Sequence, residues 1–275
     1  MSYFKSWNTY QKFARRIMFE NRYVLDSESL DFLETLAANS EDRKISIEKG
    51  RILWRAQLGN DWMEENIQRG EGDLIETLDV PTCFPPGRMK PLAKKAKEGR
   101  INPKGIPCLY LSTKKETAMS EVRPWIGAAI SLSQFKVNRA LTVLNLSKHH
   151  DRDPLYGLIF SDDEPKMDEH IDIVWTSVDR AFSDPVRSED DMAGYAPTQL
   201  IAEMFRKERY DGVVYKSPFG KDGFNVALFD INSADCINGF LYEAESIEIK
   251  FKETANPYYV TPKPMSDIPE QEPDQ

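Results

Sequence analysis

The sequence predicts an α+β domain built on a mixed, largely antiparallel sheet. Short apolar, β-prone segments alternate with segments of helical periodicity, but they do not form the regular strand–helix–strand repeat of a doubly wound sheet. No internal repeat of the kind that marks a solenoid is present. With 275 residues, the chain is long enough for one large domain or two small ones.

Residues 1–49 are predicted to form a helical N-terminal region. Phe13 and Ile17 recur at helical spacing, and Ser27 or Ser29 is suited to cap a second helix. We expect this region to pack as a small helical cap on the residues that follow.

The strands expected after this region are short and apolar. They cover residues 51–58, 106–112, 130–137, 141–146, 212–216, 224–229 and 247–251. The expected helices cover residues 113–122, 170–182 and 197–207. Thr113 and Glu116 form a capping-box pattern at the start of the first of these helices. Pro197 suits the first turn of the last one.

Three segments are expected to lack a regular core structure. Residues 70–99 are rich in proline, glycine and charge, which predicts a long surface loop with a short helix at 92–97. An acidic loop is expected at 151–163, and the acidic, proline-rich tail at 257–275 is expected to be disordered. Residues 50–256 then form the main domain, for which the catalytic role is argued below.

Composition and charge exclude several classes of protein. A net charge of −9 does not favour general binding of nucleic acid, which needs a basic face. The longest uncharged apolar stretch, 124–135, is shorter than the roughly 20 residues that a membrane-spanning helix needs. No secretory signal is evident, and the three scattered cysteines indicate neither a disulfide framework nor a zinc knuckle. A cytoplasmic location without membrane contact is therefore expected.

Several catalytic motifs are absent from the sequence. The glycines form no dinucleotide-binding G-x-G-x-x-G, no P-loop and no serine-hydrolase elbow. Of the three histidines, His149 and His150 are adjacent and have no evident further ligand, so we interpret them as a solvated loop pair. No metal is expected.

Three segments, at 53–56, 99–122 and 210–229, carry polar residues that a core would not explain. The candidate site residues are Arg55, Arg100, Tyr110, Glu121, Ser217 and Asn225. Taken singly, Glu121 fits a solvated helix face, Tyr110 a core position and Ser217 a turn. The hypothesis of a site rests on their order along the chain.

Together these segments resemble the RES domain family, which is named for an Arg, a Glu and a Ser. The block from Gly99 to Val122 matches the family's Gly-Arg-x-Asn segment, its Leu-Tyr-Leu strand and its glutamate. Residues 210–229 match its later Asp-Gly, Ser and Asn segment, and residues 194–200 look like its longer members. One departure is Ala56, where many members place an aromatic residue.

The resemblance implies a fold similar to that of the ADP-ribosyltransferases, with NAD+ as substrate and no further cofactor. Members of the family often act as toxins that deplete NAD+, and many are paired with a helix-turn-helix antitoxin. We therefore expect NAD+ and such an antitoxin as partners, and a homo-oligomer is left open.

The residues suit this chemistry. Cleavage of the nicotinamide–ribose bond passes through an oxocarbenium-like state, which a carboxylate stabilises. Glu121 is the expected carboxylate, and Arg55 and Arg100 are the expected pyrophosphate ligands because guanidinium groups match phosphate oxygens. Tyr110 is expected to stack on the nicotinamide ring, and Ser217 to hydrogen-bond the ribose or the carboxamide.

Asn225 completes the expected NAD+ contacts, and three functions stay open. The first is an NAD+ glycohydrolase or phosphorylase, which differ in whether water or phosphate takes the ribosyl carbon. The second is an ADP-ribosyltransferase that modifies a macromolecular acceptor at the same site. The third is a non-catalytic NAD-binding module, for which Ala56 leaves room.

Overall fold

The computed structural model describes residues 3–68, 75–92, 95–148, 150–151, 165–167, 169–184, 192–219 and 222–251. Residues Met1–Glu245 belong to one compact unit, and Ser246–Gln275 form a second one, described only as far as Phe251. The tail predicted at 257–275 and all but Asp151 of the loop predicted at 151–163 lie outside the described residues.

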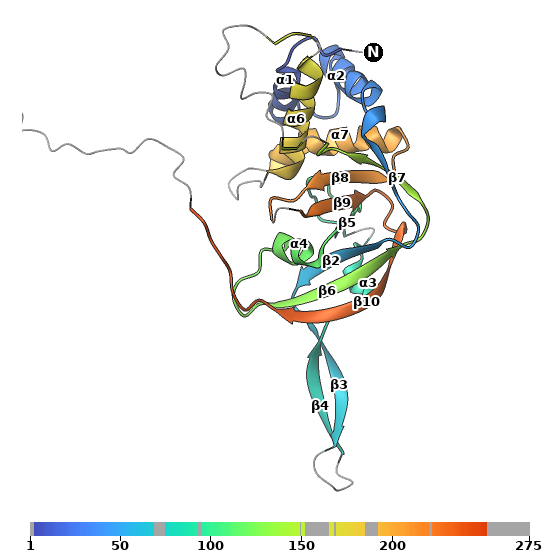
Figure 1. The fold of residues 1–275 in the computed structure, drawn as a ribbon, viewed down its shortest axis with the longest axis vertical. Helices are drawn as coiled ribbons and strands as arrows, with labels where there is room; N and C mark the ends of the chain where they lie inside the picture. The colour runs from blue at the N-terminus through green and yellow to red at the C-terminus, as the bar shows by residue number, and fades with distance from the viewer. Residues whose placement is uncertain are drawn as a thin grey trace, which may run out of the picture. The chain divides into compact units, whose positions relative to one another are not determined.

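The first unit is built on an eight-stranded sheet with the spatial order β1-β7-β8-β9-β5-β2-β6-β10 (Figure 1). Its strands are β1 (Lys44–Ile47), β2 (Ile52–Leu58), β5 (Leu109–Ser112), β6 (Ala129–Val137), β7 (Leu141–Asn145), β8 (Gly212–Lys216), β9 (Phe224–Leu228) and β10 (Ala234–Glu243). β7 and β8 run parallel, and the other neighbours are antiparallel. The predicted α+β class with a mixed, largely antiparallel sheet is confirmed.

Four helices share one hydrophobic core beside β8. They are α1 (Thr9–Phe19), α2 (Ser27–Ala38), α6 (Glu169–Ser183) and α7 (Ala196–Lys207). Phe13 of α1 stacks on Phe32 of α2 with ring centroids 4.4 Å apart, and Trp175 of α6 stacks on Phe205 of α7. Within the described part of the chain, no helix is both long enough and apolar enough to cross a membrane.

The N-terminal region is not wholly helical, as the sequence pattern suggested. β1 lies within it and pairs with β7, so this region contributes an edge strand to the main sheet. The cap of α2 is also different, because the Asp26 carboxylate accepts a hydrogen bond from the backbone N–H of Ser29 at 2.7 Å. Ser27 is the first residue of the helix itself.

The long loop predicted at 70–99 contains regular structure instead. β3 (Asp61–Gln68) and β4 (Ile75–Thr82) form a separate two-stranded hairpin, and α3 (Pro86–Met89) follows. The described part of the helix predicted at 92–97 is not helical. The hairpin escaped prediction because its strands are mostly exposed and carry many charged and polar side chains, so they lack the apolar alternation of a half-buried strand.

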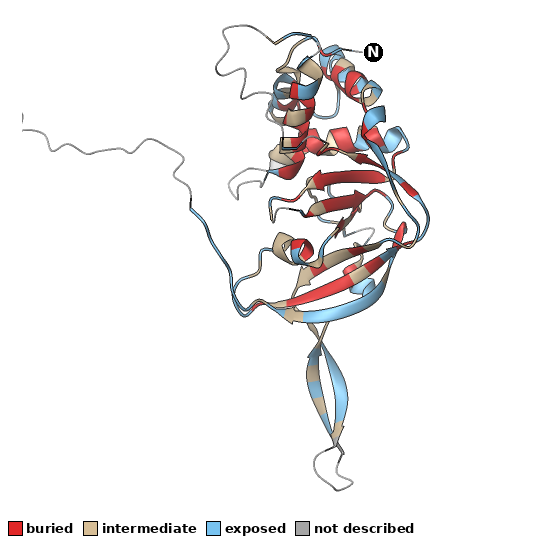
Figure 2. Cartoon of the chain, viewed as in Figure 1, coloured by how far each residue is buried: buried red, intermediate tan, exposed pale blue. Residues whose placement is uncertain are grey.

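The last strand also differs from the prediction. Residues 247–251 form no strand, whereas β10 pairs with β6 along the sheet edge. Figure 2 shows the central strands as buried and β10 as mostly exposed. An edge strand covered on few sides tolerates polar residues, and Asn238 and Gly239 hide its pattern.

Candidate functional site

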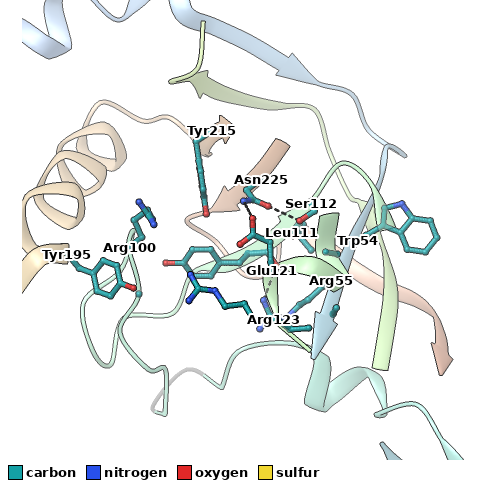
Figure 3. A pocket seen from close by; sticks show the side chains of 15 residues that line it. Trp54, Arg55, Arg100, Leu111, Ser112, Glu121, Arg123, Tyr195, Tyr215 and Asn225 are labelled. Carbon is teal, nitrogen blue, oxygen red and sulfur yellow. Dashed lines mark hydrogen bonds between the residues drawn. The ribbon is translucent and has the colours of Figure 1, made fainter. Parts of the chain in front are cut away.

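A pocket of about 620 Å³ opens where β2 and β5 diverge. These strands pair at a single position, Trp54 with Ser112, before each continues beside another neighbour. Helix α4 (Lys115–Glu121) and the loop at 99–100 complete its walls (Figure 3). Five of the six predicted site residues line it, namely Arg55, Arg100, Tyr110, Glu121 and Asn225.

The sixth predicted residue, Ser217, holds Glu121 in place. Its hydroxyl donates to Glu121 Oε1 at 2.7 Å, and the side-chain amide of Asn225 donates to the same oxygen at 2.6 Å. Ser112 donates in turn to Asn225 Oδ1 at 2.8 Å, which fixes the amide orientation (Figure 3). These contacts leave Glu121 Oε2 free of any hydrogen bond to the described residues.

Glu121 stands at an unusual place for a carboxylate. It is the last residue of α4, where the negative end of the helix dipole opposes an anionic side chain. The predicted capping box at the other end of α4 is wrong, since Thr113 Oγ1 bonds to the backbone of Phe224 and the N-cap is Lys114. Two side-chain donors therefore offset an unfavourable location of the carboxylate.

Arg55 projects from β2 and is only partly paired. Its Nη1 donates to the carbonyl oxygen of Tyr110 at 2.9 Å, and its Nε is buried without a hydrogen-bond partner. Burial lowers the pKa of Arg55, but a guanidinium stays charged near neutral pH. A buried N–H without an acceptor is costly, and an anionic ligand in the pocket would satisfy it.

Tyr110 is anchored through its hydroxyl. The hydroxyl donates to Asn102 Oδ1 at 2.7 Å and accepts from the backbone N–H of Ile101 at 3.1 Å. A Cβ at Gly99 would lie 2.8 Å from this hydroxyl, so a glycine is needed there. Burial raises the pKa of Tyr110 well above its ordinary value of 10.0. The ring lines the pocket while the hydroxyl belongs to the loop.

Arg100 is largely engaged within the protein. Its guanidinium donates to the carbonyl oxygens of Ala181 and Asp184, at the C-terminal end of α6. Cations are favourable there because the last carbonyls of a helix lack intrahelical partners. The start of α7 secures the same loop, with Thr198 Oγ1 donating to the Arg100 carbonyl oxygen at 2.6 Å.

Three lining residues were missed by the sequence analysis. They are Arg123, Tyr195 and Tyr215. Tyr215 is 7% exposed, and burial raises its pKa above the usual range. An apolar strand position explains Tyr215 equally well from sequence alone, and only the tertiary fold brings it to the pocket.

The histidine pair contributes nothing to this pocket. His150 Nδ1 lies 2.5 Å from Asp179 Oδ2, while His149 lies outside the described residues. No group of three metal-ligating side chains gathers in the part of the chain that the structure describes.

The pocket differs in charge from the rest of the chain. Arg55, Arg100 and Arg123 line it together with one carboxylate, Glu121, although the protein carries −9 overall. With two tyrosines from separate segments, Tyr110 and Tyr215 among them, it suits an anionic ligand that also has flat rings.

Comparison with known families agrees with this arrangement. The RES domain model matches residues 82–248, more than half of the chain. The chain belongs to the RES domain family. Among solved structures, this RES protein is similar to "Crystal structure of the M.tuberculosis MbcT-MbcA toxin-antitoxin complex", with 15% identity, a TM-score of 0.38, and coverage of 76% of this chain and 92% of that chain. No curated protein matches it.

Two residues that carry the resemblance to the RES family serve the fold. A Cβ at Gly212 would lie 2.2 Å from the carbonyl oxygen of Ala227 on the neighbouring strand β9, so any side chain would clash with backbone. Asp211 accepts hydrogen bonds from Arg139 at 2.6 Å and from the backbone N–H of Thr142 at 2.8 Å. This Asp-Gly pair therefore joins β7, β8 and β9 beside the site.

Proposed function

We propose that this RES protein consumes NAD+ by cleaving the bond between nicotinamide and ribose. The observation that carries the proposal is Glu121, held by Ser217 and Asn225 in a pocket that three arginines make cationic. The resemblance to the RES family independently points to NAD+.

The arrangement supports a division of labour in the pocket. Nicotinamide leaves as a neutral group, so its departure needs no general acid. Positive charge develops on the ribose, and the carboxylate of Glu121 stabilises it electrostatically or holds the ribose hydroxyls through Oε2. The buried Nε of Arg55 offers a hydrogen bond to an oxyanion of the ligand, and Tyr110 offers a ring face.

Water and phosphate are both suitable acceptors of the ribosyl carbon in this proposal. A glycohydrolase would produce ADP-ribose, and a phosphorylase would produce phosphorylated ADP-ribose. The same pocket would serve either reaction, because the acceptor enters only after the nicotinamide–ribose bond has loosened.

A second candidate function is transfer of ADP-ribose to a macromolecule. Trp125 and Ile126 follow α4 closely and are 65% and 66% exposed, which favours a protein-binding surface near the pocket. A non-catalytic NAD-binding module is the weaker alternative, since it would not require a carboxylate with two dedicated donors.

The biological role that we propose is that of a cytoplasmic toxin which depletes NAD+ and is controlled by an antitoxin of the helix-turn-helix class. This rests on the family resemblance. Binding of a candidate antitoxin should suppress NAD+ loss if the proposal is right.

The test is nicotinamide release from NAD+ by the purified protein, with and without inorganic phosphate, with products resolved by mass. Release in both conditions with ADP-ribose as product identifies a glycohydrolase. Release that requires phosphate identifies a phosphorylase, and ADP-ribose attached to an added protein identifies a transferase. NAD+ that binds without being cleaved under any of these conditions would contradict the proposal.

A further inference from the structure

The three arginines of the pocket differ in how far they are already engaged. Arg100 donates to two backbone carbonyls at the end of α6, and Arg55 donates to the carbonyl of Tyr110. Arg123 makes no side-chain hydrogen bond or ion pair with any of the described residues. Among these three, Arg123 is therefore the cation whose full hydrogen-bonding capacity is available to a ligand.

The position of Arg123 is fixed by the end of α4. It follows the C-cap residue Val122, and its backbone N–H donates to the carbonyl of Ser120 at 3.0 Å. It lies two residues after Glu121, so one short segment carries both the carboxylate and the free cation. In Figure 3 the side chain extends from α4 toward the side of the pocket formed by Tyr195.

We propose that Arg123 is the principal phosphate-binding residue of the pocket, and that it selects ligands carrying a diphosphate group. This inference rests on the proposed NAD+ site and deepens it. It moves the main phosphate contact from Arg100, whose guanidinium serves as a ligand of the α6 C-terminus, to a residue that sequence reasoning did not single out. The guanidinium fork of Arg123 matches two phosphate oxygens, and Arg55 supplies a second contact from the pocket floor.

The chain offers a matched control for this residue. Arg123 has a left-handed backbone with φ of 47°, and Arg209 has φ of 65° at the end of α7. The N–H of Arg209 likewise donates to a carbonyl three residues earlier, that of Arg206 at 3.1 Å. Arg209 is exposed and does not line the pocket. Glycine suits such a position in both cases, so R123G and R209G remove the same charge from equivalent backbone sites.

The experiment compares the wild type with R123G, R123K and R209G. Steady-state kinetics are measured with NAD+ and with nicotinamide riboside, which has the same scissile bond and no phosphate. For NAD+, R123G should raise KM about 10- to 100-fold, the loss expected for a charge-assisted hydrogen bond to phosphate. R123K should lie between R123G and the wild type. Nicotinamide riboside should show no such rise, and R209G should match the wild type with both substrates.

Melting temperatures separate this outcome from a folding defect. R123G and R209G should melt at or above the wild-type temperature, because glycine relieves the left-handed backbone. An unchanged KM for NAD+ in R123G would overturn the inference, and so would an equal loss with nicotinamide riboside. Neither result would touch the proposed function, which fails only if the wild type cleaves no NAD+.

If the wild type cleaves no NAD+, titration calorimetry with inorganic pyrophosphate still decides the role of Arg123. Binding by the wild type and R209G, with at least tenfold weaker binding by R123G, supports the inference. Equal binding by all three proteins, or none by the wild type, overturns it.

Discussion

Replacing Ser217 with alanine removes one of the two donors that hold Glu121. The lost contact is an O–H···O hydrogen bond of 2.7 Å to a carboxylate, donated by a side chain that is 2% exposed. Hydrogen bonds to charged groups contribute about 1.5–3 kcal/mol, so S217A should lower the free energy of unfolding by about that amount. Asn225 would remain as the single donor to Oε1.

A double-mutant cycle isolates the charge-dependent part of this contact. In E121Q the amide oxygen still accepts from Ser217, but a neutral hydrogen bond contributes only about 0.5–1.5 kcal/mol. S217A should therefore cost about 1 kcal/mol less in the E121Q background than in the wild type. Urea unfolding of the four proteins measures this difference directly.

Activity provides the second measurement for this pair. Loss of one donor should lower kcat for NAD+ cleavage by about tenfold or more, since each 1.36 kcal/mol of lost transition-state stabilisation is a factor of ten. A folded S217A protein with wild-type stability and wild-type kcat would refute the idea that Ser217 positions the carboxylate. Equal costs of S217A in both backgrounds would refute the charge-assisted bond.

Two further predictions concern the Asp-Gly pair beside the site. G212A should fold poorly or melt far below the wild type by circular dichroism, because its Cβ would lie 2.2 Å from the carbonyl oxygen of Ala227; wild-type stability would contradict the close strand approach. Partial burial raises the pKa of Asp211, but hydrogen bonds from Arg139 and a backbone N–H outweigh it and lower the pKa below 3.8. Asp211 therefore stabilises the fold fully above its unfolded pKa, and this contribution is lost as the pH falls through the lower folded pKa. D211N should be less stable than the wild type at pH 7, and the gap should narrow below about pH 4 in pH-dependent urea unfolding; a gap constant with pH would count against this assignment.

The central sheet could be predicted because its strands are buried on both faces or alternate strictly. Residues 212–216 and 130–137 are such segments, and the structure has β8 and β6 there. β10 and the β3–β4 hairpin could not be predicted, because their strands are largely exposed and need not be apolar. Their pairing is decided by neighbouring strands that lie far away in the sequence.

The site was predictable through an ordered set of residues, and its details were not. Arg55, Tyr110 and Glu121 come together as expected, but Ser217 contacts the carboxylate rather than the open pocket. The engagement of Arg100 by α6 depends on a contact across more than 80 residues, which no local pattern encodes.

The most direct test of the account is the rate of nicotinamide release by E121Q. Glu116 on the exposed face of the same helix supplies the matched control, E116Q, which makes the same change outside the pocket. The account predicts that E121Q melts at or above the wild-type temperature, because it removes a carboxylate from a helix C-terminus, and that it releases nicotinamide at least a hundredfold more slowly. E116Q should match the wild type in rate. A well-folded E121Q protein with the wild-type rate would show that the carboxylate at the centre of this pocket takes no part in the reaction.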